Sequence, residues 1–340
     1  MKKIKIIVDY KGFFGSKQKS LIYRGGMDLG HLVRLFNYKG FDVEILNFSD
    51  IDFVKIKQES PFVIYTSSED FGGFYKSFIE DIILSLEDAG VTCLPSYNYL
   101  RAHNNKVYME LLRRSRNFEE LSSISSRVFG SFEELKNTTQ EFKFPVVIKP
   151  ASGAMSRGVS IAYNYDELLK KTQKISSTRN IIFDLKDRLR KLKYGDRYVP
   201  ESLNRSKFIV QNFIPNLNND WKVLVYGNKL FVLYRGNREN DFRASGSGKF
   251  IFRKDIPEGI LDYAYSIMKK FDVPNISLDI GFDGKQFHTL EFQFLYFGTT
   301  TLEKSPFYFE KNGNSWDIVD KSLCLEEVYV ESIVHYLREK

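Results

Sequence analysis

Residues 144–160 combine the residue types of a phosphate-binding loop. Val146 to Ile148 predict a buried strand that carries Lys149 at its end, and Pro150 stops the strand because it has no N–H to donate. The loop beyond it is rich in small and hydroxyl-bearing residues, namely Ser152, Gly153, Ser156 and Gly158. Such residues let backbone N–H groups approach an anion closely.

A second strand, residues 159–162, follows this loop, so the segment predicts a strand–loop–strand hairpin that folds over phosphates. It is not a Walker loop, because no Gly-Lys-Ser/Thr leads into a helix. An ordinary glycine-containing hairpin with a surface lysine has the same pattern, so the residues alone leave that alternative open.

A second group of chemically competent residues lies near the C-terminus. The turn Asp283-Gly284 separates two predicted strands, 276–282 and 287–294, which would bring Asp279 and Glu291 side by side. Gln293 is two residues beyond Glu291 and therefore shares its face. Two carboxylates and an amide oxygen are ligands of the kind that magnesium binds, and the pattern predicts a metal site. The alternative is a solvated strand face.

The elements that must position these groups fall into three predicted domains. Residues 1–95 alternate strands (4–8, 41–48, 62–66) with helices (one from the Gly25-Gly26 turn to residue 39, and 74–89), which predicts a small parallel sheet. Residues 96–212 hold a helix capped by Asn104 or Asn105, the phosphate hairpin, a helix over 165–175 and a strand over 208–211. The charge-dense residues 183–207 lack clear periodicity beyond one or two helical turns and predict an insertion or mobile loop.

Residues 213–340 complete the chain with a predicted hairpin of strands 221–226 and 229–235, a small-residue loop over 241–248, a helix over 260–271 and the carboxylate hairpin. The overall class is therefore α/β with a mixed α+β arrangement.

Composition limits the functional classes. The 340 residues carry a net charge of +7, but the basic residues are scattered, so we expect no nucleic-acid partner. Cys93 and Cys324 lie far apart without metal-ligand spacing, which indicates a reducing compartment. The N-terminus predicts a strand and not a signal peptide, and no stretch approaches a membrane span. We expect a cytoplasmic protein without a membrane partner; a homo-oligomer is left open.

The order of the motifs resembles the ATP-grasp superfamily, in particular the carboxylate–amine ligases that include glutathione synthetases and the glutamate ligases acting on a ribosomal protein. The resemblance runs from Asn104 to Gln293 through Asn105-Lys106, 145–150 with its loop, 210–214, 220–223, Arg235, 241–244 and the carboxylate hairpin. It implies a small N-terminal domain followed by two subdomains that sandwich ATP.

The resemblance also implies roles for individual residues. Lys106 and Lys149 would bind ATP phosphates, and the loop from Ser152 to Gly158 would close over them. The hinge Gln211, Asn212, Phe213 and Ile214 would hold adenine, and Asp220 and Lys222 would belong to the nucleotide site. Arg243 and Arg235 would stabilise the transferring phosphoryl group. Asp279, Glu291 and Gln293 would hold magnesium, as two ions, with manganese as a substitute.

Three positions depart from the family pattern. Asn212 stands where an acidic residue is usual, Lys222 where arginine is common, and Gln293 where asparagine binds metal. Gln293 keeps the amide oxygen on a longer stem, whereas Lys222 keeps charge but loses the bidentate fork.

The implied activity is ATP-dependent ligation of a carboxylate to an amine through an acyl-phosphate, with release of ADP and phosphate. The partners would be small-molecule or peptide carboxylate and amine substrates. A phosphotransferase that releases a phosphorylated small molecule, and a non-catalytic ATP-binding protein, are the two alternatives. The chain from 1 to 95 and residues 183–207 match the family too loosely to identify the substrates.

Overall fold

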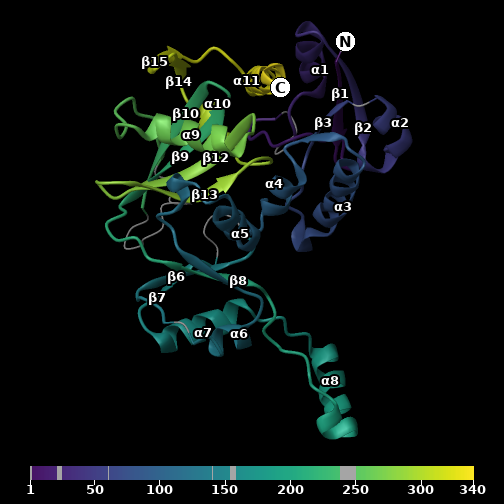
Figure 1. Ribbon diagram of the computed structural model, residues 1–340, viewed down its shortest axis with the longest axis vertical. Coiled ribbons are helices and arrows are strands. Elements are labelled where there is room, and N and C mark those ends of the chain that lie inside the picture. The colour runs from purple at the N-terminus through teal and green to yellow at the C-terminus, as the bar shows by residue number, and fades with distance from the viewer. Residues whose placement is uncertain (1, 21–24, 60, 140, 154–157, 238–249) are drawn as a thin grey trace. The chain divides into compact units, whose positions relative to one another are not determined.

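The computed structural model describes residues 2–20, 25–59, 61–139, 141–153, 158–237 and 250–340 (Figure 1). The chain forms two compact units. Unit 1 consists of Met1–His103, Phe118–Leu121 and Leu217–Lys340, and unit 2 of Asn104–Asn117 and Ser122–Asn216. The boundaries 1–95, 96–212 and 213–340 stay a prediction. In the described ranges, no helix is both long enough and apolar enough to cross a membrane.

The N-terminal part of unit 1 is a four-stranded parallel sheet, as the alternating pattern predicted. Its order is β2-β1-β3-β4, with β1 Lys2–Val8, β2 Phe41–Asn47, β3 Phe62–Tyr65 and β4 Thr92–Leu94. The helices of this part are α1 Leu29–Tyr38, α2 Phe53–Glu59, α3 Phe74–Asp88 and α4 Tyr97–Ala102, with 3-10 turns η1 Phe48–Asp50 and η2 Phe71–Gly73. The apolar side chains of β1, β3 and β4 are mostly buried, whereas the edge strand β2 is partly exposed and its Glu44 forms an ion pair with Lys5 of β1.

The second sheet of unit 1 is antiparallel and seven-stranded. Its main path is β13-β12-β9-β10-β14-β15, and β11 pairs with β10. The strands are β9 Asn219–Tyr226, β10 Lys229–Gly236, β11 Phe250–Ile251, β12 Asn275–Phe282, β13 Phe287–Gln293, β14 Phe307–Asn312 and β15 Ser315–Asp320. The helices of this part are α9 Ile260–Phe271, α10 Thr300–Lys304 and α11 Leu325–Glu339, and η3 Glu119–Leu121 also belongs to unit 1.

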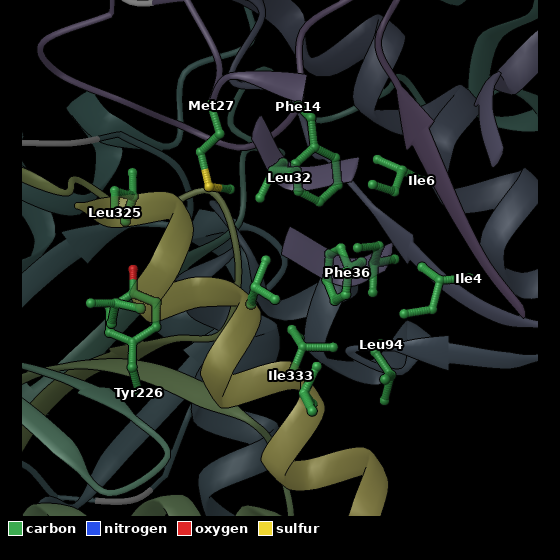
Figure 2. Packing of buried hydrophobic residues seen from close by; sticks show 14 of the residues in the cluster. Ile4, Ile6, Phe14, Met27, Leu32, Phe36, Leu94, Tyr226, Leu325 and Ile333 are labelled. Atoms are coloured by element: carbon green, nitrogen blue, oxygen red, sulfur yellow. The ribbon is translucent and has the colours of Figure 1, made fainter. Parts of the chain in front are cut away.

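A single apolar core joins the two sheets of unit 1. Helix α11 supplies Leu325 and Ile333 to it, the N-terminal sheet supplies Ile4 and Leu94, and β9 supplies Tyr226 (Figure 2). Each such buried side chain contributes about 2 kcal/mol of hydrophobic transfer energy. The packing therefore fixes α11 against both the N-terminal sheet and β9.

Unit 2 is built on a four-stranded sheet of order β5-β8-β6-β7. The strands are β5 Ser126–Phe129, β6 Val146–Pro150, β7 Ser160–Ala162 and β8 Phe208–Asn212. The helices are α5 Lys106–Arg116, α6 Phe132–Lys136, α7 Tyr165–Ile175 and α8 Ile181–Tyr194, followed by η4 Gly195–Arg197. One face of the sheet packs its apolar residues against Leu135 of α6 and Leu168 of α7. The β6–β7 pair confirms the predicted hairpin.

The prediction that residues 183–207 lack periodicity beyond one or two helical turns is wrong for their first part, because α8 is a helix of 14 residues. Asn180 caps it by accepting a hydrogen bond from the backbone N–H of Phe183 at 3.1 Å. Ile181, Leu185 and Leu189 repeat at intervals of four residues, which is helical spacing. Interleaved charges obscured this repeat in the sequence.

Candidate functional site

The charged candidate residues of unit 1 lie on one face of the antiparallel sheet. The register pairs Asp220 of β9 with Arg235 of β10, and Lys222 of β9 with Asp279 of β12. Asp279 in turn lies opposite Glu291 of β13. Directly paired residues of antiparallel strands point to the same face, so all five side chains share it. Gln293 and Ser277, which pair with each other, lie on the same face.

Along β9, this face changes from charged to apolar. Leu224 and Tyr226, near the C-terminal end of the strand, belong to the apolar core with α11, whereas Asp220 and Lys222 precede them on the same side. The opposite face is apolar and is covered by α9, whose Phe271 ring contacts the Phe292 ring at a centroid distance of 5.1 Å. The charged side chains therefore lie on one face of a sheet whose opposite face packs against α9.

Arg235 bridges two carboxylates. Its Nε and Nη2 donate to Asp220 Oδ1 and Oδ2 at 2.5 and 2.8 Å, and Nη2 lies 2.7 Å from Asp279 Oδ2. Arg235 and Asp220 are 6% and 5% exposed. A buried guanidinium that satisfies two carboxylates fixes the orientation of both.

Lys222 completes this network from the other side of Asp279. Its Nζ donates to Ser277 Oγ at 2.9 Å and to Asp279 Oδ1 at 3.2 Å. Burial by itself would raise the pKa of Asp279, but the charges of Arg235 and Lys222 outweigh it and hold the pKa below its usual range. Burial, aided by the charge of Asp279, raises the pKa of Asp220 to about 6 against the opposing effect of Arg235. The pKa of Asp279 therefore lies below that of Asp220, because Asp279 has two cationic neighbours.

Glu291 and Gln293 extend the oxygen-rich group toward the edge strand β13. Gln293 Nε2 donates to Glu291 Oε1 at 3.2 Å, which sets the two side chains beside each other. With Asp279 they form a donor set of two carboxylates and one amide oxygen, partly exposed on one face. This set fits magnesium by ligand type.

The turn that closes the hairpin is held by Asp283. Its Oδ1 accepts from the backbone N–H groups of Lys285 and Gln286 at 2.8 and 2.9 Å, and Oδ2 lies 3.0 Å from His288 Nε2. The hydrogen bond from Gln286, the contact with His288 and the hydrogen bond from Lys285 lower the pKa of Asp283 to about 2. Gly284 follows with φ 92°, a conformation that favours glycine. These contacts fix the loop that joins β12 to β13.

In unit 2, Lys149 and Gln211 lie on the face of the sheet opposite the α6–α7 core. Val147 pairs with Gln211, and Lys149 lies two residues further along β6. Gln211 is 4% exposed, and its Oε1 has no hydrogen-bond partner among the described residues. A buried unpaired amide oxygen carries a desolvation cost of roughly 1–3 kcal/mol. A hydrogen-bond donor on a bound ligand would offset this cost.

The start of α5 is tied to the loop after β6. Lys106 Nζ donates to the Gly153 carbonyl at 2.9 Å, and its backbone N–H donates to the Ala151 carbonyl at 2.7 Å. Asn104 Oδ1 accepts from the Gly153 N–H at 3.1 Å. Lys106 and Gly153 are thereby brought together, as two of the predicted phosphate-binding residues.

The remaining loop residues fall partly outside the described ranges. Ser152 is exposed, and Gly158 has φ 75° with space for a Cβ only 3.1 Å from Pro150 Cγ, which explains glycine at this position. Ser156 and Arg243 lie outside the described residues, so their predicted roles stay predictions.

The hinge residues that follow β8 differ in their surroundings. Asn212 Oδ1 accepts from the Ser125 N–H at 2.7 Å, and the Asn212 N–H donates to the Ser125 carbonyl at 3.0 Å. Ile214 is buried and Phe213 is half-buried. The amide of Asn212 thus stabilises the local backbone.

Two residues that contact predicted site residues were not themselves predicted as site residues. Ser277 is the hydroxyl partner of Lys222, and Asn104 holds the Gly153 N–H. The spacing of Ser277 from Asp279, two residues on one strand, was a signal that could have identified it. Asn104 was considered only as a helix cap; its φ of 48° is visible only in the structure.

A cavity of about 40 Å³ lies in unit 1 near the carboxyl ends of the parallel strands. Residues that follow β1, β3 and β4 line it together with the segment after β13, including Ser16, Thr66, Pro95 and Tyr296. Since a buried water needs on the order of 10–15 Å³, the cavity has room for a few water-sized groups. The carboxyl ends of parallel strands are where α/β sheets bind ligands.

No protein-family model and no curated protein matches this chain. Among solved structures, D-cycloserine synthetase DcsG is similar with a TM-score of 0.55 and 12% identity, over 98% of this chain and 99% of that one.

Two further structures match at a TM-score of 0.50, each over 98% of this chain and 99% of the other. One is a RimK domain ATP-grasp protein from Sphaerobacter thermophilus DSM 20745, at 11% identity. The other is macrocyclase MdnC from Microcystis aeruginosa MRC, bound with precursor peptide MdnA, at 12% identity. At these identities the likeness is one of fold, and by that likeness the chain has the mixed α/β fold of the ATP-grasp ligases.

Proposed function

We propose that this protein is an ATP-dependent ligase that joins a carboxylate to an amine through an acyl-phosphate. The observation that carries the proposal is the one-sided group on the antiparallel sheet of unit 1, in which Asp279, Glu291 and Gln293 stand beside Lys222 and Arg235. The similarity in fold between this chain and ATP-grasp ligases supports the same function.

Unit 2 would supply the groups that bind the nucleotide. Lys149 and Lys106 would neutralise phosphate oxygens, and the N–H groups around Gly153 and Gly158 would approach them closely. The Oε1 of Gln211, which pairs with no described residue, would accept a hydrogen bond from an exocyclic amine such as that of adenine. This pairing would offset the desolvation cost of the buried amide.

Unit 1 would supply the groups around the transferring phosphate. Asp279, Glu291 and Gln293 would hold magnesium, which neutralises charge on phosphate oxygens when bound. Arg235 was predicted to contact the phosphoryl group; its two carboxylate partners support a positioning role through Asp279 instead. Arg243 stays the proposed residue that contacts the phosphoryl group directly.

The chemistry requires positioning and charge neutralisation more than a protein nucleophile. A substrate carboxylate oxygen would attack the γ-phosphorus, and the bond to the ADP oxygen would break. The amine nitrogen would then attack the acyl carbon, phosphate would leave, and the nitrogen would lose a proton to substrate or water. We propose the cavity at the carboxyl ends of the parallel strands as a place where part of a substrate is held.

The test is a screen of carboxylates and amines with ATP and magnesium, followed by mass analysis of the products. ADP together with an amide supports ligation. ADP together with a stable phosphorylated product would establish a phosphotransferase instead, and tight ATP binding without turnover on any pair would establish a binding protein. The Glu291→Gln variant serves as the blank for contaminating ATPases.

A further inference from the structure

Helix α8 of unit 2 has an aliphatic face that nothing in the described chain covers. Five side chains form it, which we call the α8 stripe: Ile181, Ile182, Leu185, Leu189 and Leu192. They are 86%, 70%, 58%, 56% and 82% exposed. At about 100° per residue they fall within one arc of roughly 100°, the width of an amphipathic helix face that normally faces a core. In Figure 1, α8 stands away from β6, β7, α6 and α7 of the same unit.

The opposite side of α8 is the one held by its own chain. Asp187 is the buried residue of the helix, and it accepts hydrogen bonds from the Tyr198 hydroxyl and from the Glu201 N–H, the latter at 3.0 Å. The return segment after η4 therefore packs on the Asp187 side. The α8 stripe lies on the side of the helix opposite this contact, and its side chains are exposed.

Cations border the α8 stripe on both sides. By the same rotation, Lys186 and Lys193 adjoin one edge of the stripe and Arg188 the other. All three are exposed. Within the described residues Lys186 and Arg188 form no ion pair, and Lys193 stacks its Nζ 5.2 Å from the Tyr194 ring. The helix carries five basic and two acidic side chains, a net charge of +3 (5 − 2).

The charges of α8 indicate which kind of partner would bind the α8 stripe. A second copy of the chain would bring two helices of like charge together, which is unfavourable. An aliphatic stripe edged on both sides by Lys and Arg is the pattern of a helix that lies in the surface of an anionic bilayer. There the stripe enters the acyl boundary while the long cationic side chains reach the headgroups.

We propose that α8 docks the protein on an anionic lipid surface. The helix would lie in the plane of the membrane with the α8 stripe buried, and the Asp187 side with its return segment would face the water. The sequence led us to expect no membrane partner; that expectation addressed spanning segments, and a surface helix is a different mode of contact. The proposal is independent of the ligase activity.

The experiment is sedimentation of the full-length protein with phosphatidylcholine vesicles that contain either no anionic lipid or phosphatidylglycerol. We expect binding only to the anionic vesicles, weakening as salt rises. Leu185→Gln with Leu189→Gln keeps helix-forming residues and should lower the partition coefficient at least tenfold. Lys186→Gln with Arg188→Gln should lower it by roughly fivefold for each cation, from about 1 kcal/mol per charge.

The matched control is Val54→Gln on α2, an aliphatic residue that is 68% exposed outside α8. It should bind vesicles as the wild type does. Circular dichroism of every variant checks that α8 still forms. Absence of binding to anionic vesicles at low salt would overturn the proposal, as would binding that the Leu185/Leu189 variant retains. A dimer that this variant abolishes, or capture of a poly-glutamate peptide through α8 without vesicle binding, would replace the lipid surface by a protein partner.

Discussion

Asp279 lies directly opposite Glu291 in the register of β12 and β13, at the point where the register shifts before Ile280. The irregularity brings two carboxylates of neighbouring strands together, and like charges in this position repel unless cations compensate. Arg235 and Lys222 compensate Asp279 from the other side. A bound divalent cation would complete the compensation for Glu291.

Removing charge at either carboxylate should therefore stop turnover without unfolding the protein. Asp279→Asn and Glu291→Gln keep the side-chain volume, and we expect each to lower kcat at least a hundredfold, a loss of about 3 kcal/mol or more in barrier height. The measurement is ATP turnover against magnesium concentration, with thermal melting as the check on folding. Ser277→Ala, which removes only a partner of Lys222, is the milder comparison. Near wild-type activity of either carboxylate variant at low magnesium would exclude the metal role.

Lys149 and Arg243 should affect different kinetic constants. Lys149 follows a buried strand and would meet ATP in the ground state, so Lys149→Ala should weaken ATP binding first. Arg243 precedes the carboxylate hairpin in the chain and would act on the transferring group. Arg243→Ala should then cost about two orders of magnitude in kcat, roughly 3 kcal/mol, with little change in ATP affinity. ATP affinity and single-turnover rates of both variants decide this, and an Arg243 variant that binds ATP poorly yet turns over normally at saturation contradicts it.

Gln211 should favour nucleotide binding at a cost in the stability of the nucleotide-free protein. Gln211→Met removes a buried amide oxygen that has no hydrogen-bond partner among the described residues, so we expect the nucleotide-free variant to melt at the same temperature as the wild type or higher. The rise in melting temperature on adding ATP should be smaller, because the variant lacks the acceptor. Thermal melts with and without ATP measure both. An ATP-induced rise equal to that of the wild type would argue against nucleotide contact at Gln211.

The turn at Asp283 makes stability depend on pH in the acid range. Its pKa lies at about 2 in the folded protein against an ordinary value of 3.8. A lowered carboxyl pKa contributes stability that is present above about 4 and is lost as the pH falls through about 2. Asp283→Asn should therefore be less stable than the wild type at pH 6, and the difference should shrink toward pH 2. Urea denaturation midpoints across this range test it, with Asp42→Asn on the exposed side of β2 as the control; a difference that does not vary with pH would refute it.

The sequence predicted the elements whose apolar repeat is uninterrupted. Helices α7 and α9 have the predicted bounds, and the parallel sheet and the β6–β7 hairpin follow the predicted pattern. Helix α8 was missed because charged residues interrupt its aliphatic repeat, and no element was predicted beyond 294, where β14, β15 and α11 are formed. These strands and this helix are determined by packing against β10 and the N-terminal sheet, which is long-range information.

For the candidate site, alternation within strands predicted which residues share a face. The spacing predicted that Asp279 and Glu291 lie side by side, because one turn joins their strands. It could not give the bridge from Arg235 to Asp220 and Asp279, since this depends on β12 pairing with β9 and not with another strand. Nor could the spacing show that the Oε1 of Gln211 lacks a hydrogen-bond partner in the part of the chain that the structure describes, because this depends on the surroundings of β8.

The central claim is that an acyl-phosphate forms and is captured by an amine. The direct measurement is trapping with hydroxylamine, a small amine, in the presence of ATP, magnesium and a pool of carboxylates. The account predicts a hydroxamate formed in step with ADP and phosphate, and lost in the Glu291→Gln variant. A stable phosphorylated product formed with ADP, without any hydroxamate, would contradict it.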